Sequence, residues 1–142
     1  MEFERILVPV DGTETDEEAI SLACTISKVS GKTRVFAVHI IPVERALPLD
    51  AELSSAINKS EGILAKAEEI AEKQGVKLET DLLQAREVAN AIIDEAVEKE
   101  IDLILIGLSY KTRFGEFCMG GVLPYILQNA PCRVIVYHQR KV

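Results

Sequence analysis

The sequence predicts an α/β protein with a doubly wound, five-stranded parallel sheet, strand order 3-2-1-4-5 and helices on both faces. Short apolar runs alternate with amphipathic helical segments along the whole chain, which is the pattern of repeated strand-helix-strand units. Apolar residues make up 48% of the chain but aromatic residues only 5%, with no Trp, which is typical of helices that cover a parallel sheet. Crossovers between parallel strands are right-handed, and this limits the possible topologies.

The first strand is predicted at Ile6–Val10, a short apolar run of the buried type. Thr15 and Glu18 fit a T-x-x-E capping box at the start of the first helix, and acidic residues there suit the helix dipole. This helix is expected to end at Gly31. Val35–Ile41 is the second predicted strand, which Pro42 ends.

A loop from Val43 to Pro48 leads into a long amphipathic helix that should end at Gly75. Its apolar face is formed by Leu53, Ala56, Ile57, Ile63, Leu64, Ala67 and Ile70. The following segment, Val76–Leu83, alternates at first between apolar and polar residues. This alternation predicts a third strand nearer the edge of the sheet.

Helical spacing of Val88, Ile92 and Ala96 marks the third helix, and Leu103–Ile106 is the fourth predicted strand. Proline is tolerated in the first turn of a helix but not in its interior, so Pro124 indicates a last helix that begins close to Gly121. A loop from Gly107 to Gly120 then precedes this helix. Val134–Tyr137 is the fifth strand.

Length and charge limit the possible functions. At 142 residues, the chain is expected to form one domain, residues 1–142. Its 23 acidic and 16 basic residues give a net charge of −7, which argues against general binding of nucleic acids or anionic membranes. The three cysteines form no C-x-x-C pair, and the first residues do not resemble a signal peptide. We therefore expect a cytoplasmic protein with reduced thiols.

The predicted strand order makes the first and fourth strands neighbours at the topological switch point, where ligands bind outside the carboxyl ends of the strands. Asp11 follows the first strand. Its carboxylate could accept from a ribose hydroxyl or help to hold a metal ion, or it could serve only as a turn residue. Ser109, Lys111, Thr112 and Arg113 follow Gly107. Their hydroxyls and cations suit a phosphate chain, although each cation could equally be a solvated loop residue.

Several other classes are excluded or disfavoured. The turn after the first strand lacks the G-x-G-x-x-G of dinucleotide-binding folds, and no P-loop motif occurs. The chain lacks acidic residues at the positions that a receiver domain requires. No catalytic set of a nucleophilic residue and a histidine can be argued from the sequence. His39 lies in an apolar strand and is expected to be a hydrogen-bonded core residue, because it has no companions at metal-ligand spacing.

The last strand would lie at an edge of the sheet. An open apolar edge invites aggregation and is normally covered. The sequence therefore predicts a homodimer in which Val134, Ile135, Val136 and Tyr137 pair with the same strand of a second copy.

Three segments resemble the universal stress protein family. Ile6–Thr13 (ILVPVDGT) resembles its first strand and turn, Val38–Ile40 its second strand, and Ala130–Val136 (APCRVIV) its last strand. Nucleotide-binding members carry G-x2-G-x9-G-[ST] after the fourth strand. Gly107 and Gly120 match the first and third glycines of this motif, whereas Tyr110 replaces the middle glycine and Gly121 replaces the Ser or Thr.

The resemblance implies a site for ATP or a related adenine nucleotide, possibly with Mg or Mn. Pro9, Val10, Asp11 and Ile40 would line the adenine and ribose. The phosphates would be framed by Ile106, Gly107, Ser109, Lys111, Gly120, Gly121 and Val122. The leading interpretation is a cytoplasmic homodimer that binds the nucleotide as a regulatory ligand in stress response. One alternative is a nucleotide-free dimeric interaction module. Another is a slow ATPase, which is less favoured because no general base is identifiable.

Overall fold

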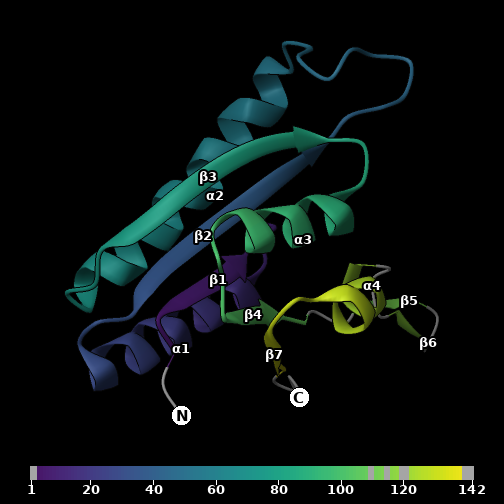
Figure 1. Ribbon diagram of the computed structural model, residues 1–142. Coiled ribbons are helices and arrows are strands. Elements are labelled where there is room, and N and C mark those ends of the chain that lie inside the picture. Colours follow the sequence, from purple (N-terminus) through teal and green to yellow (C-terminus); the bar gives the residue numbers. More distant parts are fainter. Residues whose placement is uncertain (1–2, 109–110, 114–115, 119–121, 139–142) are drawn as a thin grey trace.

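A five-stranded parallel sheet is the centre of the computed structural model, which describes residues 3–108, 111–113, 116–118 and 122–138 (Figure 1). The strand order is β3-β2-β1-β4-β7, which confirms the predicted order 3-2-1-4-5. The strands are β1 (Arg5–Pro9), β2 (Arg34–Pro42), β3 (Leu78–Ala85), β4 (Leu103–Gly107) and β7 (Arg133–Tyr137). β1 therefore has β2 on one side and β4 on the other.

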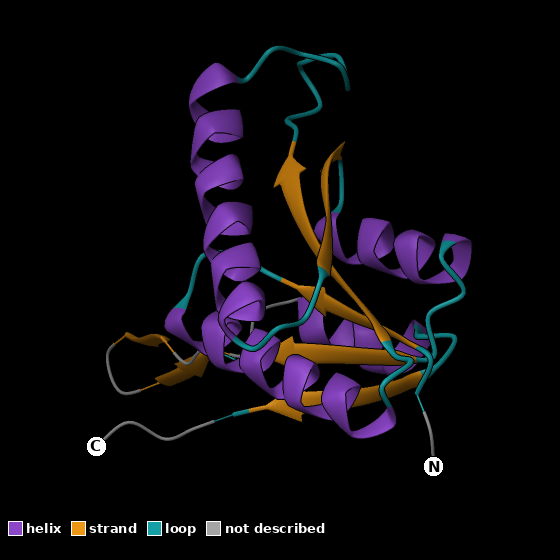
Figure 2. Cartoon of the chain, turned by 90° about the vertical axis from the view of Figure 1, so that its left-hand side faces the viewer, coloured by secondary structure: helices purple, strands orange, loops and turns teal. Residues whose placement is uncertain are grey.

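Two helices cover each face of the sheet, which confirms the prediction of helices on both faces. α1 (Glu14–Ser30) and α2 (Ser54–Lys73) pack on one face, where Val8, Ile20 and Leu64 belong to one buried cluster. α3 (Val88–Glu98) and α4 (Val122–Asn129) pack on the other face around a second cluster. Figure 2 shows α2 and α3 on opposite sides of the sheet. None of the helices in the described part of the chain is long and apolar enough to span a membrane.

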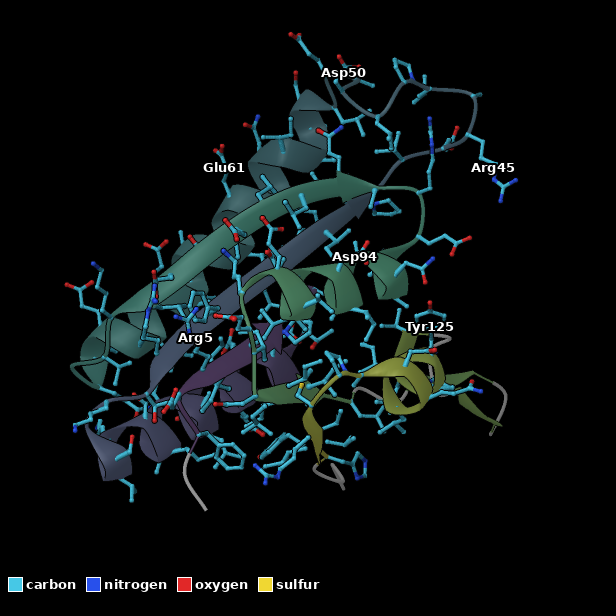
Figure 3. All side chains as sticks on the ribbon, in the orientation of Figure 1. Arg5, Arg45, Asp50, Glu61, Asp94 and Tyr125 are labelled. Carbon is cyan, nitrogen blue, oxygen red and sulfur yellow. The ribbon has the colours of Figure 1, made fainter. Side chains whose placement is uncertain are left out.

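The outer faces of α2 and α3 carry charged residues. Glu61 on α2 and Asp94 on α3 are exposed and extend away from the sheet (Figure 3). In these two helices, apolar residues at helical spacing face the sheet while charged residues face solvent, which is the amphipathic pattern from which the helices were predicted. Some apolar side chains are exposed as well, among them Val97 on α3 and Tyr125 and Leu127 on α4.

The start of α1 differs from the prediction. The N-cap is Thr13, whose backbone is extended at φ −93° and ψ 160°, and the capping box pairs it with Asp16. Thr15 and Glu18, the expected pair, lie inside the helix. The sequence contains two overlapping T-x-x-[DE] patterns, and the earlier one begins the helix because the chain has already left the sheet at Val10.

The third strand and the loop after the fourth strand also differ from the prediction. The third strand was expected from Val76 to Leu83 but is observed as Leu78–Ala85. Val76 instead completes the end of α2, where its N–H donates to the carbonyl of Ala71. The predicted loop after the fourth strand contains a small antiparallel pair, β5 (Lys111–Arg113) with β6 (Glu116–Cys118). Thr112 pairs with Phe117 there, and both residue types favour strands.

Candidate functional site

The carboxyl ends of β1 and β4 separate at the switch point of the sheet. The ladder between them consists of Ile6–Leu103 and Leu7–Ile104, although β1 continues to Pro9 and β4 to Gly107. The ladder between β1 and β2, in contrast, continues to Pro9. Beyond Ile104, the end of β4 is therefore free of β1, and this is the place where doubly wound folds receive ligands.

The first turn of α1 lies against the end of β4. A Cβ atom placed on Gly107 would come within 2.9 Å of the Thr15 carbonyl oxygen and 3.0 Å of Thr15 Cγ2. Real Cβ atoms essentially never lie as close to another atom as 2.9 Å. Gly107 therefore has a structural role, because only glycine lets β4 approach α1 so closely. That role is independent of any phosphate.

Four apolar residues of the predicted nucleotide site lie on the same face of the sheet. Ile40 at the end of β2 and Ile106 at the end of β4 belong to the cluster beneath α3 and α4, with exposed fractions of 6% and 9%. Val122, at the start of α4, packs against the same cluster. Pro9 is buried, and the alternation along β1 places it on this face together with Leu7.

Val10 is oriented differently. Its side chain belongs to the opposite cluster, beneath α1 and α2. Its backbone is held firmly, because its N–H donates to the Val38 carbonyl at 2.9 Å and its carbonyl oxygen lies 2.7 Å from His39 Nδ1. A carbonyl can only accept, so Nδ1 of this buried histidine carries the proton. His39 is thus the hydrogen-bonded core residue that the sequence predicted.

The turn between β1 and α1 contains an internal anion. Oδ2 of Asp16 accepts hydrogen bonds from the N–H groups of Asp11, Gly12 and Thr13 at 2.6, 2.7 and 2.9 Å. Asp16 is only 7% exposed, and burial raises its pKa although these hydrogen bonds oppose the shift. The three N–H groups are therefore unavailable to a phosphate.

Asp11 itself is exposed beside this turn. Its side chain is therefore accessible to a ligand, in contrast to that of Asp16. Across the described ranges 3–108, 111–113, 116–118 and 122–138, no group of three or more His, Cys, Asp or Glu side chains is placed to hold a metal ion. Asp11 would need oxygen atoms from a nucleotide to bind Mg or Mn.

Part of the predicted site lies outside the described residues. Ser109, Tyr110, Gly120 and Gly121 belong to this part, and Lys111 is described only as a backbone position in β5. The adenine and ribose half of the predicted site is therefore described, whereas the phosphate half is described only at Ile106, Gly107 and Val122 and as a backbone position at Lys111. Leu108 marks the limit, where its N–H donates to the Tyr137 carbonyl at 2.8 Å.

Comparison with known proteins decides the family. The model of the universal stress protein family matches residues 2–138. This chain is a member of the universal stress protein family. It is 33% identical over 145 residues to universal stress protein MJ0531 of Methanocaldococcus jannaschii, an alignment that covers 98% of this chain and 84% of the relative.

Solved universal stress proteins have the same fold. The structure of the universal stress protein from Archaeoglobus fulgidus in complex with dAMP is 26% identical, with a TM-score of 0.74, covering 96% of this chain and 98% of that one. A universal stress protein in complex with cAMP superimposes with a TM-score of 0.76 at 15% identity, covering 99% of this chain and all of the other. Some relatives of this universal stress protein thus bind adenine nucleotides.

The sequence did not identify Asp16 as part of the site. A signal was available, because Asp16 stands three residues after Thr13 in a capping-box pattern. Its acceptance of three N–H groups depends on the path of the turn around it. The path of the turn depends on the hydrogen bond that holds Val10 to β2, which the sequence does not reveal.

Proposed function

We propose that this universal stress protein binds an adenine nucleotide as a regulatory ligand at the carboxyl ends of β1, β2 and β4. The observation that carries this proposal is the placement of Pro9, Ile40 and Ile106 on one face where the β1–β4 ladder has ended. Apolar side chains beside an exposed carboxylate suit a ligand with an aromatic base and a ribose. The relatives in complex with dAMP and cAMP support the same ligand class.

Each part of the nucleotide has a proposed partner. Pro9 and Ile40 provide an apolar surface for the adenine, with Ile106 beside them at the phosphate end, and Asp11 accepts from the ribose hydroxyls or binds the Mg or Mn of the nucleotide. The phosphates extend away from Asp16, whose carboxylate already occupies the N–H groups of the β1–α1 turn. They are held by N–H groups between Gly107 and Val122, with Ser109, Lys111, Gly120 and Gly121 nearby in sequence.

A second candidate function is a nucleotide-free interaction module of the same fold. The anion-binding turn filled by Asp16 favours it, because this turn offers no N–H groups to a phosphate. The replacement of the motif's middle glycine by Tyr110 and of its hydroxyl residue by Gly121 favours it as well. Under this alternative, the switch point carries no small ligand.

Calorimetry distinguishes the two candidates. Freshly purified protein should release an adenine nucleotide on denaturation, and the apo protein should bind Mg-ATP, AMP or cAMP. Asp11→Ala should weaken binding, because it removes an exposed acceptor without removing a buried contact. Glu61→Gln is the matched control, since Glu61 is exposed on the outer face of α2. Absence of both released nucleotide and binding heat at millimolar ligand would leave the interaction module as the function.

The double variant Tyr110→Gly with Gly121→Ser restores the family motif. It should bind Mg-ATP about tenfold more tightly, because one more hydroxyl can donate to a phosphate and the space beside it is opened. The measurement is the dissociation constant relative to the unmodified protein. Equal affinity would mean that the loop after β4 does not contact the phosphates.

We also propose that two copies pair through β7. This strand lies at one end of the sheet order, bonded to β4 on one side. Its residues Val134, Ile135, Val136 and Tyr137 are only half-buried, which leaves apolar surface for a partner. Light scattering should give the mass of a dimer at micromolar concentrations with or without nucleotide. A monomer under both conditions would contradict this assembly.

A further inference from the structure

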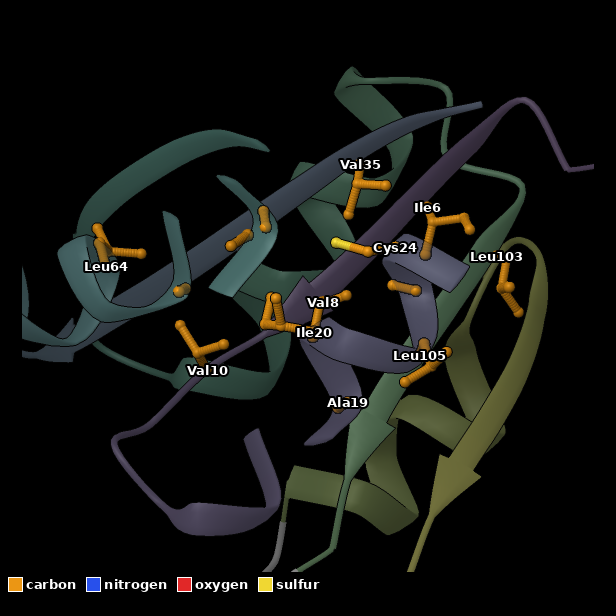
Figure 4. Packing of buried hydrophobic residues seen from close by; sticks show 14 residues of the cluster. Ile6, Val8, Val10, Ala19, Ile20, Cys24, Val35, Leu64, Leu103 and Leu105 are labelled. Carbon is orange, nitrogen blue, oxygen red and sulfur yellow. The ribbon is translucent and has the colours of Figure 1, made fainter. Parts of the chain in front are cut away.

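A cavity of about 230 Å³ lies between α1 and α2. It is on the sheet face opposite to Ile40 and Ile106, and so its side chains are separate from the proposed nucleotide site. Figure 4 shows the buried cluster beneath α1 and α2, with Val10 and Ile20 on the side where Leu64 lies. The lining residues are Val10, Gly12, Thr13, Asp16, Glu17, Ile20, Lys59, Gly62, Ile63, Lys66, Ala67 and Ile70.

Gly62 lines this cavity and has open space beside it. It lies in the interior of α2, where glycine is unfavourable for the helix, and an added Cβ would meet no atom within 4 Å. Packing therefore does not require a glycine here. The next residue differs, because Ile63 packs so closely on the β1–α1 turn that a Cβ on Gly12 would lie 3.0 Å from Ile63 Cδ1.

The two helices are held at a fixed separation beside the cavity. Lys66 Nζ on α2 lies 2.7 Å from Glu17 Oε1 on α1. Further along, Gln74 Nε2 donates to Ser21 Oγ at 2.7 Å. These contacts prevent the two helices from moving together into the space beside Gly62.

Charge and polarity are distributed unevenly around the cavity. Its floor is aliphatic, formed by Val10, Ile20, Ile63, Ala67 and Ile70. Lys66 is already paired with Glu17. Within the described part of the chain, the Lys59 side chain has no hydrogen-bond or ion-pair partner, and this residue is exposed at the cavity.

We propose that this cavity binds a small amphiphilic anion, an unbranched aliphatic carboxylate whose chain lies on the aliphatic floor and whose carboxylate pairs with Lys59. The carboxylate stays away from Asp16, because this buried acidic group also lines the cavity and would repel it. Engineered cavities of about 150 Å³ bind benzene and drug-sized ligands need about 300 Å³ or more, so a chain of about six to eight carbons matches the volume.

Sodium octanoate is the probe, with 1-octanol as its neutral counterpart. In ¹⁵N-labelled protein, octanoate should shift the amide signals of Gly12 and Gly62. Lys59→Gln should weaken octanoate binding about fivefold, as expected for an exposed ion pair, and leave octanol binding unchanged. Lys73→Gln is the matched control, since Lys73 lies on the same helix but does not line the cavity.

Gly62→Leu should fill the cavity and reduce the affinity for both octanoate and octanol at least tenfold, while circular dichroism verifies that the variant is folded. Nucleotide affinity should be unchanged in this variant, which separates this proposal from the proposed function. Octanoate binding that survives Gly62→Leu, or that Mg-ATP displaces competitively, would overturn the assignment. Shifts confined to residues away from α1 and α2 would overturn it too.

Discussion

Replacing Gly107 with alanine is expected to lower the free energy of unfolding by about 2–3 kcal/mol, the upper part of the range for an overpacked site. The new methyl group would lie 2.9 Å from the Thr15 carbonyl oxygen and 3.1 Å from its carbonyl carbon. These are backbone atoms in the first turn of α1, so they cannot turn aside as a flexible side chain would. Urea denaturation of Gly107→Ala beside the unmodified protein measures the loss.

Gly62→Ala is the matched control for this experiment. Its added Cβ meets no atom within 4 Å, and alanine favours the interior of α2. We expect it to raise the free energy of unfolding by about 0.5–1 kcal/mol. If Gly107→Ala were as harmless as Gly62→Ala, β4 would not lie against α1 as described. The contrast therefore tests the close approach and not glycine replacement in general.

Replacing Glu95 with glutamine is expected to stabilise the protein above neutral pH. Glu95 is 5% exposed on α3, and its Oε2 atom has no hydrogen-bond partner. Burial, together with the nearby carboxylate of Asp81 on β3, raises its pKa to about 7. Lys99 gives limited compensation, because its Nζ lies 2.8 Å from Asp81 Oδ2 but 3.8 Å from Glu95 Oε1.

The direction of the pH dependence follows from the raised pKa. The folded protein holds the Glu95 proton up to about pH 7, whereas the unfolded chain releases it near the ordinary value of 4.5. The stabilising contribution of the protonated carboxyl is therefore complete below the unfolded value and is lost as the pH rises through 7. At pH 8 the ionised group destabilises the fold by up to about 3 kcal/mol.

Urea denaturation between pH 5 and pH 8 measures this effect. Glu95→Gln keeps the shape of the side chain without its charge, so its advantage over the unmodified protein should grow with pH to about 1–3 kcal/mol. Asp94→Asn, an exposed neighbour on the same helix, should show no such growth. An advantage independent of pH would mean that Glu95 is already ionised at pH 5 in the folded protein.

The sequence was sufficient to predict the strand order of the sheet and the helices on both of its faces. Continuous apolar runs such as Ile6–Val10 identified the buried strands, because a strand covered on both faces cannot be polar on either side. The start of α1 could not be decided in the same way. Two capping patterns, which begin at Thr13 and Thr15, overlap in the sequence. Which of them caps the helix depends on where the chain leaves the sheet.

The apolar half of the candidate site was also accessible to sequence reasoning. Strand order and alternation place Pro9, Ile40 and Ile106 at neighbouring strand ends. Contacts between segments distant in sequence could not be predicted from the sequence. The approach of Gly107 to Thr15 and the proximity of Glu95 to Asp81 depend on how the helices are seated, which periodicity does not determine.

The carboxylate of Asp16 has a consequence for ligand choice. It is a covalently tethered competitor for the N–H groups of the β1–α1 turn, and a short tether gives it an effective concentration of millimolar order or above. A dissolved phosphate or sulfate must outcompete it to bind there. At this turn the protein therefore selects by exclusion, rejecting anions that the geometry of a helix amino terminus would otherwise attract.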